Sequence, residues 1–180
     1  MRGVFPALAV CLFAVGMALA ASPPGVWLDV PFVAQPKDGC GAASIAMIMQ
    51  YWERGLHQSH SSRADVDAIQ RALYSKQARG IFASSMERYF HDAGYRTFAI
   101  RGEWEDLREN LSQGRPLIVL LEPAGPRDPL HYVVVAGIDW QNNLVFINDP
   151  ARRKLSKISR AEFEKEWRAE GNWTLLPVPQ

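Results

Sequence analysis

The chain has 180 residues, of which 48% are hydrophobic and 22% are charged, and its formal net charge is +1. This composition is ordinary for one globular domain with a real core. The near-zero net charge excludes a global field that would draw the protein to nucleic acid or to an anionic membrane. The sequence has no internal repeat, low-complexity tract or long block of like charges.

The first twenty residues differ from the rest. Arg2 is their only charged residue, an apolar stretch follows it, and the segment ends in Ala18-Leu19-Ala20. A basic head, an apolar middle and a small-x-small end are typical of a secretory signal. We therefore expect residues 1–20 to be a cleaved signal peptide and residues 21–180 to form a single domain, exported to the periplasm or the cell exterior. The alternative is a membrane anchor over residues 4–21, which is about long enough to span a bilayer.

Cleavage after Ala20 would leave Cys40 as the only cysteine, because Cys11 lies in the removed segment. A single cysteine in an exported protein cannot form an internal disulfide, so it is either a reactive thiol or half of an intermolecular bridge. Gly39 and Gly41 flank Cys40, and we interpret them as clearance for a substrate carbonyl. The ordinary alternative is that Cys40 is a small buried hydrophobic residue.

An apolar run follows Cys40 and covers every side of a helix. Such a helix is buried all round, so the sequence predicts a central helix from Cys40 to Trp52. Cys40 would open this helix, where unpaired backbone N–H groups and the helix dipole stabilise a thiolate. Because the thiolate is the nucleophilic form, this placement favours a reactive cysteine.

The other elements follow from periodicity and turn residues. Residues 26–34 are predicted as an extended entry segment, limited by Pro31 to an edge position, and Asp38-Gly39 as a turn. Ser62, and Ser84 or Ser85, are expected to cap two helices. The predicted helices after the first span residues 62–73, 84–94, 104–113 and 159–168, with loops at 55–62 and 122–129. The predicted strands span residues 95–100, 116–121, 131–138, 144–148 and 173–176.

Helices dominate the first half of this pattern and strands the second, which favours an α+β fold with an antiparallel sheet. We expect an N-terminal helical half with a central buried helix, followed by a C-terminal antiparallel sheet. The hairpin from His131 to Asp149 is the best-defined part, because both strands are rich in β-branched residues and the turn Asn142-Asn143 separates them.

A cysteine nucleophile needs a base, and the chain has four histidines. His57 and His60 lie in a polar loop and His91 lies on a charged helix, so we expect all three at the surface. The spacing of His57 and His60 could suit a metal, but no carboxylate or cysteine pattern supports one. His131 opens the strongest strand, at the rim of the sheet, where its side chain can face a cleft. The alternative is that His131 is a hydrogen-bonded residue at the strand edge with no catalytic role.

The base must in turn be oriented by a third group. An antiparallel hairpin returns Asn148 and Asp149 beside His131, and either could hold the imidazole. Because side chains alternate faces along a strand, the two cannot point the same way. Gln35 stands before the Asp38-Gly39 turn, and its side-chain amide can join the backbone N–H of Cys40 as a donor to an oxyanion.

These residues resemble a known family. Gln-x-x-x-x-Cys-Gly leading into an apolar helix, then His-Tyr-Val-Val-Val, then a strand ending in Asp-Pro-Ala, is similar to the double-glycine leader cysteine peptidases. These are the bacteriocin-processing peptidases of the papain-like clan, family thirty-nine of the cysteine peptidases. The resemblance extends from Val30 to about Trp173. It implies a papain-like α+β fold and hydrolysis of peptide bonds through a thioester, often after a Gly-Gly pair.

Carried onto this sequence, the resemblance implies that Cys40 is the nucleophile, His131 the general base and acid, Asp149 the orienting carboxylate and Gln35 the oxyanion donor. The partner would be a peptide or protein substrate, with no metal or organic cofactor and no nucleic acid. A membrane would be involved only if residues 4–21 were retained as an anchor.

The sequence also departs from the family. Gly39 stands where the family usually has Asp, and the gap from Gln35 to Cys40 is one residue shorter than the family pattern. Arg152-Arg153-Lys154 follows Asp-Pro-Ala, where the family often has a glycine.

Two other interpretations of the same residues remain. The site could serve acyl transfer to an amine, or act as an amidase on a non-peptide amide. Alternatively, the exported domain could bind peptides without catalysis, although a binding module has no need of Cys40, His131 and Asp149 together.

Overall fold

A computed structural model describes residues 24–122, 130–152 and 155–180. The expected signal peptide or anchor (1–21) and nearly all of the loop expected at 122–129 lie outside these ranges. The helices are α1 (Cys40–Gly55), α2 (Val66–Leu73), α3 (Ala83–Asp92), α4 (Trp104–Ser112) and α5 (Arg160–Ala169), with a short 3-10 turn η1 (Ser62–Ala64). The strands are β1 (Gly25–Trp27), β2 (Tyr95–Arg101), β3 (Leu117–Leu121), β4 (His131–Asp139), β5 (Leu144–Asn148), β6 (Ser156–Ser159) and β7 (Trp173–Pro179).

Within the described ranges these strands form one sheet in the order β2-β7-β3-β4-β5-β6, and β1 pairs with the C-terminal end of β4. All the pairings are antiparallel, as predicted. β3 runs beside β4 from Leu117 opposite Val135 to Leu121 opposite His131. β5 returns along the other side of β4, with a bulge between Val135 and Gly137. This register brings His131, at the start of β4, and the last residue of β5 to the same end of the strands.

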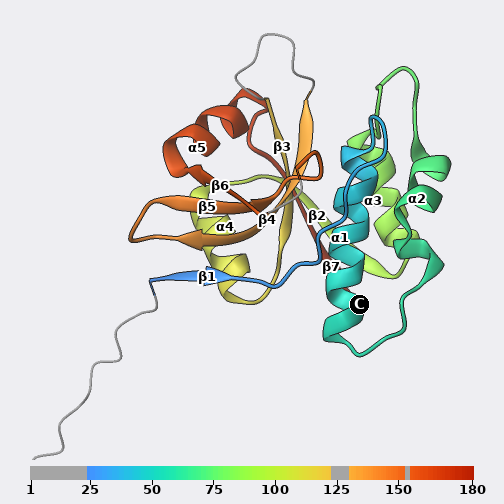
Figure 1. The fold of residues 1–180 in the computed structure, drawn as a ribbon, viewed down its shortest axis with the longest axis horizontal. Coiled ribbons are helices and arrows are strands. Elements are labelled where there is room, and N and C mark those ends of the chain that lie inside the picture. Colours follow the sequence, from blue (N-terminus) through green and yellow to red (C-terminus); the bar gives the residue numbers. More distant parts are fainter. Residues whose placement is uncertain (1–23, 123–129, 153–154) are drawn as a thin grey trace, which may run out of the picture.

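Helices cover both faces of the sheet (Figure 1). On one face α1, α2 and α3 form a core with sheet residues such as Val134 and Leu175. On the other face α4 and α5 form a second core with residues such as Val133. Because both faces of β4 are covered, its residues 132–138 are all buried, which explains the unbroken apolar run in the sequence. The prediction of a helical half and a sheet is thus confirmed for α1–α3, but it missed the second helical layer.

The predicted central helix is confirmed, and it continues to Gly55. Residues 41–49 are all buried, so α1 has no polar face at its N-terminal half. Burying each large apolar side chain there contributes about 1.5–3 kcal/mol. Towards the C-terminal end the buried Glu53 accepts hydrogen bonds from the Ser61 N–H at 3.3 Å, and lies 3.3 Å from His60 Nδ1. These contacts tie the polar loop back onto the helix.

The two helix caps predicted in the first half were wrong. Ser62 lies in η1, and the α2 helix begins after Asp65, whose side chain accepts a hydrogen bond from Ala68 N at 2.8 Å. The α3 helix begins at Ala83 and has no side-chain cap, so neither Ser84 nor Ser85 plays that role.

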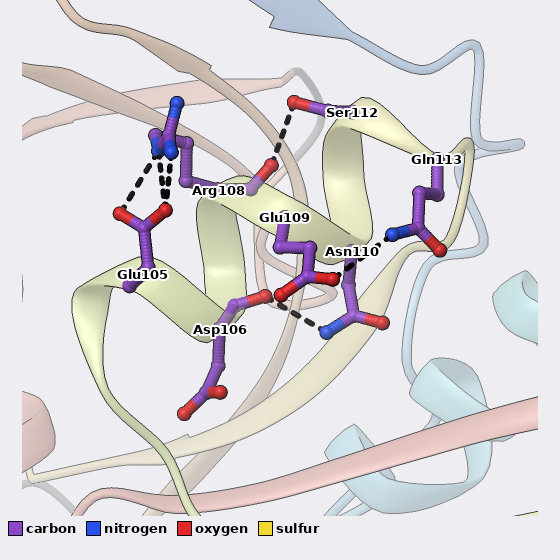
Figure 2. A network of polar contacts seen from close by, with 7 residues as sticks. All are labelled: Glu105, Asp106, Arg108, Glu109, Asn110, Ser112 and Gln113. Atoms are coloured by element: carbon purple, nitrogen blue, oxygen red, sulfur yellow. Dashed lines mark hydrogen bonds and ion pairs between the residues drawn. The ribbon is translucent and has the colours of Figure 1, made fainter.

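The later helices match the prediction closely. Ser159 caps α5, and α4 ends before Gly114, which has a φ of 74°. Figure 2 shows that α4 carries a row of polar contacts on its exposed side, including an ion pair between Glu105 and Arg108. These contacts stabilise the helix locally.

Three strand predictions need revision. The entry segment pairs only over Gly25–Trp27, and β6 has no counterpart in the prediction. The last predicted strand, expected over residues 173–176, continues to Pro179 as β7, which lies inside the sheet between β2 and β3. None of the described helices is long and apolar enough to cross a bilayer.

Candidate active site

Cys40 is the first residue of α1 and is partly buried. The Gly39 carbonyl accepts the first helical hydrogen bond, from Ala43 N at 3.0 Å. The N–H groups of Cys40, Gly41 and Ala42 therefore have no acceptor within the helix, and no side chain caps this end. The thiol thus lies at the positive end of the helix dipole, an environment that stabilises an anion.

The flanking glycines are required by packing. A Cβ on Gly39 would lie 2.6 Å from Pro36 Cγ, and a Cβ on Gly41 would lie 3.1 Å from Ile81 Cβ and 3.4 Å from Tyr132 Cδ2. The protein itself therefore fills the space that these glycines leave. Our interpretation of them as clearance for a substrate carbonyl is wrong, because they instead let the entry turn and the core close around the start of α1.

His131 and Asp149 form a hydrogen-bonded pair where β4 begins and β5 ends. His131 is the first residue of β4 and Asp149 directly follows β5. His131 Nε2 lies 2.7 Å from Asp149 Oδ1, and the two side chains are only 15% and 10% exposed. The backbone N–H of Ala151 also donates to Oδ1, at 2.9 Å. The carboxylate thus fixes the orientation of the imidazole ring.

Cys40 interacts with the other side of the imidazole. A hydrogen bond to Cys40 and a charge interaction with Cys40 both contribute to the raised pKa of His131, which places the thiol within interaction range of the ring. Because Nε2 faces Asp149, Nδ1 is the ring nitrogen left for the sulfur. The packing of α1 on β4 makes this contact possible, and a hydrogen bond of 3.4 Å from Ser44 Oγ to the Tyr132 carbonyl joins the two elements.

The electrostatics favour a charged imidazole. Burial acts to lower the pKa of His131, but the hydrogen bonds to Asp149 and Cys40 and the charges of both outweigh burial and raise the pKa to about 9. Burial likewise acts to raise the pKa of Asp149. The hydrogen bond and charge of His131, the Ala151 N–H and the Arg152 guanidinium together hold that pKa below its ordinary value. Near neutral pH the site therefore holds an imidazolium beside a carboxylate.

The choice between Asn148 and Asp149 is resolved by the geometry. Asn148 Nδ2 donates to the Val30 carbonyl at 3.1 Å and to the Pro31 carbonyl at 3.4 Å. It therefore holds the entry segment against the sheet, while Asp149 contacts His131. The predicted alternation of the two side chains accounts for this division.

Gln35 lies five residues before Cys40, and its backbone links this segment to the turn after Asp149. Its backbone N–H donates to the Pro150 carbonyl at 3.0 Å, in the turn that follows Asp149. The Pro36 carbonyl accepts from Gly39 N at 3.0 Å, in the turn that precedes Cys40. The side-chain Oε1 of Gln35 is buried and has no hydrogen-bond partner among the described residues.

Arg152 also reaches the site, although in the sequence it stands out only as part of a departure from the family pattern. Its Nε lies 3.1 Å from Asp149 Oδ2. The sequence signal that could have found it is the spacing of three residues after Asp149 across an Asp-Pro turn, which favours contact between the two side chains.

The other histidines lie apart from this cluster, as expected. His60 contacts Glu53, and His91 Nδ1 lies 3.6 Å from the Asp92 carboxylate, with both histidine side chains exposed. His57 is also exposed, with a φ of 54°. Within the part of the chain that the structure describes, no group of three or more His, Cys, Asp or Glu side chains is placed to hold a metal.

The buried helix beginning at the cysteine and the antiparallel sheet carrying the histidine and carboxylate form a papain-like α+β fold. The chain belongs to the Peptidase_C39 like family, whose model matches residues 27–174. The fold class and the family predicted from the sequence are therefore confirmed, and the protein is a cysteine-type hydrolase.

Solved structures give the same fold. A C39-like peptidase from Bacillus anthracis, as that structure is described, matches with a TM-score of 0.64 and 20% identity, over 87% of this chain and 98% of the other. The peptidase domain of Streptococcus ComA, a bifunctional ABC transporter of a quorum sensing pathway, matches with a TM-score of 0.59 and 26% identity, over 83% and 98%. Xylellain, a cysteine protease from Xylella fastidiosa, matches with a TM-score of 0.56 and 12% identity, over 89% and 88%. No curated protein matches the chain.

Proposed function

We propose that the protein hydrolyses peptide bonds through a thioester on Cys40, and that it does so outside the cytoplasm, where its signal-like first twenty residues would send it. The observation that carries the reaction is the 2.7 Å hydrogen bond between the His131 ring and the Asp149 carboxylate, together with the interaction of that ring with the Cys40 thiol at the start of α1. Each member is held by an element end that the fold fixes, so the groups need little rearrangement before reaction.

The proposed reaction begins from a thiolate at Cys40 and an imidazolium at His131. The thiolate attacks the carbonyl carbon of the peptide bond, and a tetrahedral oxyanion forms. The C–N bond then breaks as His131 gives its proton to the leaving amine, which leaves a thioester on Cys40. Neutral His131 next takes a proton from water as the water attacks the thioester. Release of the carboxylic acid restores the thiolate and the imidazolium.

The oxyanion needs donors, and two groups can supply them. The backbone N–H of Cys40 has no acceptor within α1, as described above, and the Gln35 side chain provides an amide. The support for Gln35 is its backbone anchor to the turn after Asp149 and the burial of its Oε1, because a half-buried amide cannot move far from this position.

Replacing Gln35 with alanine is expected to lower kcat by about a hundredfold and to leave KM nearly unchanged, since the lost donor acts mainly in the transition state. Steady-state kinetics with a fluorogenic peptide would measure this. The control is Gln50→Ala, which removes another half-buried glutamine of the same layer, bonded to the Ala64 carbonyl at 3.1 Å. Equal kcat values for Gln35→Ala and the unaltered protein would rule out the oxyanion role.

The substrate proposal is a peptide cut after small residues, such as a Gly-Gly pair, which the family resemblance implies. Matched peptides that differ only in having Gly-Gly or Leu-Leu before the cut bond would be incubated with the protein and analysed by mass spectrometry. We expect cleavage after the second glycine, with kcat/KM at least about tenfold above that for the Leu-Leu peptide. Equal cleavage of both peptides would contradict the preference.

The same experiment separates hydrolysis from acyl transfer. With an added amine, hydrolysis still yields a free carboxyl group at the cut end, while acyl transfer yields an amide of that amine. A predominance of the amide product would replace the peptidase proposal with the transferase alternative.

A further inference from the structure

The Asp149 carboxylate is held by groups on both of its oxygens. His131 Nε2 and the Ala151 N–H occupy Oδ1, at 2.7 Å and 2.9 Å. The Arg152 Nε contacts Oδ2 at 3.1 Å. The proposed mechanism uses only the contact of Asp149 Oδ1 with His131, and it gives no role to the contact of Oδ2 with Arg152.

We propose that Arg152 is a positioning residue for the reaction: by anchoring Oδ2 it keeps Oδ1 of Asp149 on the imidazole of His131. The expected effect on kcat rests on the proposed function, whereas the expected effect on the His131–Asp149 hydrogen bond does not depend on it.

The local backbone explains how Arg152 reaches the carboxylate. The Arg152 N–H donates to the Asp149 carbonyl at 2.9 Å, which closes a turn over Pro150 and Ala151. This turn places the Arg152 side chain on the same side as that of Asp149. A carboxylate held at one oxygen can swing about its Cβ–Cγ bond, whereas contacts at both oxygens fix its plane. The hydrogen bond to His131 depends on that plane.

The competing role for Arg152 is contact with substrate, because its side chain is largely solvent-exposed. It lines a hollow of the surface together with His131, Asp149 and Lys157, and a substrate carboxylate could contact it there. The two roles differ in their kinetic signature. A group that contacts substrate uniformly changes KM, whereas a group that positions the general base and acid changes kcat.

The Arg152 side chain is 70% exposed, which limits the size of the effect. An exposed ion pair contributes at most about 1 kcal/mol, which corresponds to about fivefold in rate. We therefore expect Arg152→Gln to lower kcat about twofold to fivefold with KM unchanged, and Arg152→Lys to restore at least half of the loss by keeping the charge. Because the side chain is exposed, neither variant should unfold the protein.

The control is Arg108→Gln on α4 (Figure 2). Arg108 is also exposed, and it also pairs with a carboxylate three residues away, with Nε lying 2.9 Å from both Glu105 oxygens. It differs from Arg152 in lying away from Cys40, His131 and Asp149. Its replacement should leave kcat and KM unchanged.

A second measurement does not depend on turnover. The His131 Nε2–H proton, hydrogen-bonded to Asp149 and largely shielded from water, should give a far-downfield resonance in the proton NMR spectrum. We expect the resonance in the unaltered protein and in Arg108→Gln, and its broadening by faster exchange with water in Arg152→Gln. An unchanged resonance in Arg152→Gln, or a change confined to KM, would overturn the positioning role. If no peptide is cut by the unaltered protein, the proposed function fails, while the NMR comparison still decides the role of Arg152.

Discussion

Replacing Cys40 with serine is expected to lower kcat/KM for peptide cleavage by at least about a thousandfold. A serine hydroxyl stays protonated beside an imidazolium, so the nucleophile that the helix end and His131 stabilise would be lost. The substitution is nearly isosteric at a partly buried position, so the fold should persist. Circular dichroism would verify that, and steady-state kinetics would measure the loss.

The activation of the thiol can be tested without a substrate. Cys40 should react with iodoacetamide at mildly acidic pH much faster than a small free thiol, because the proposed mechanism begins from an ion pair of Cys40 with His131. His131→Ala should bring the rate down towards that of the free thiol, leaving only the effect of the helix end. If Cys40 in the unaltered protein reacts no faster than the free thiol, the activated-nucleophile proposal fails.

Replacing Asp149 with alanine is expected to lower kcat/KM near neutral pH by about a hundredfold or more. The change also removes a hydrogen bond and a negative charge that raise the pKa of His131 to about 9, while the burial that opposes them remains. Activity requires the protonated ring, so it should fall in the unaltered protein as pH rises through about 9. In Asp149→Ala this alkaline limb should move to lower pH, as a kcat/KM profile would show.

A matched control lies at the other end of the same hairpin. Asp139 is the last residue of β4 and accepts hydrogen bonds from the Asn142 side chain at 2.8 Å and from Asn142 N at 2.9 Å, and both contacts lower its pKa. Asp139→Asn should leave the pH profile unchanged because Asp139 does not contact His131. An alkaline limb that stays near pH 9 in Asp149→Ala would mean that Asp149 does not set the pKa of His131.

Much of this fold could be predicted because the strongest patterns are local. The all-round apolar α1 and the β-branched hairpin of β4 and β5 are readable from residue type alone. The starts of α2 and α3 could not be predicted in this way. Asp65 and Phe82 precede these helices because of the path that the chain takes out of η1 and out of the loop before α3. β6 was missed because Ser-Lys-Ile-Ser has almost no pattern, and its strand conformation comes from pairing with the edge of β5.

The second helical layer was missed for a different reason. The apolar stripes of α4 and α5 do not say which surface they cover, and only tertiary packing assigns them to the second face of the sheet. The unbroken apolar run of β4 was the available clue, since a strand covered on one face would alternate.

The candidate site was predictable where its residues stand at the ends of elements. Cys40 begins a helix, His131 begins a strand and Asp149 follows one, so topology alone brings the last two together. The choice between Asn148 and Asp149 required the register of β4 against β5, which the bulge after Val135 shifts. Arg152 was missed because its contact depends on the path of one turn.

The position of β7 inside the sheet, between β2 and β3, determines when the sheet can be completed during synthesis. Its residues 173–179 lie between β2 and β3, so the strands that flank it in space are made well before it. While β7 is still missing, β3 lacks one of its two neighbouring strands. The sheet that carries His131, and on which the Cys40 helix α1 packs, is then incomplete. A ribosome-bound chain that already contains Cys40, His131 and Asp149 should therefore be inactive. Activity would first appear once β7 has inserted between β2 and β3, which makes catalysis a signal that this part of the sheet has formed.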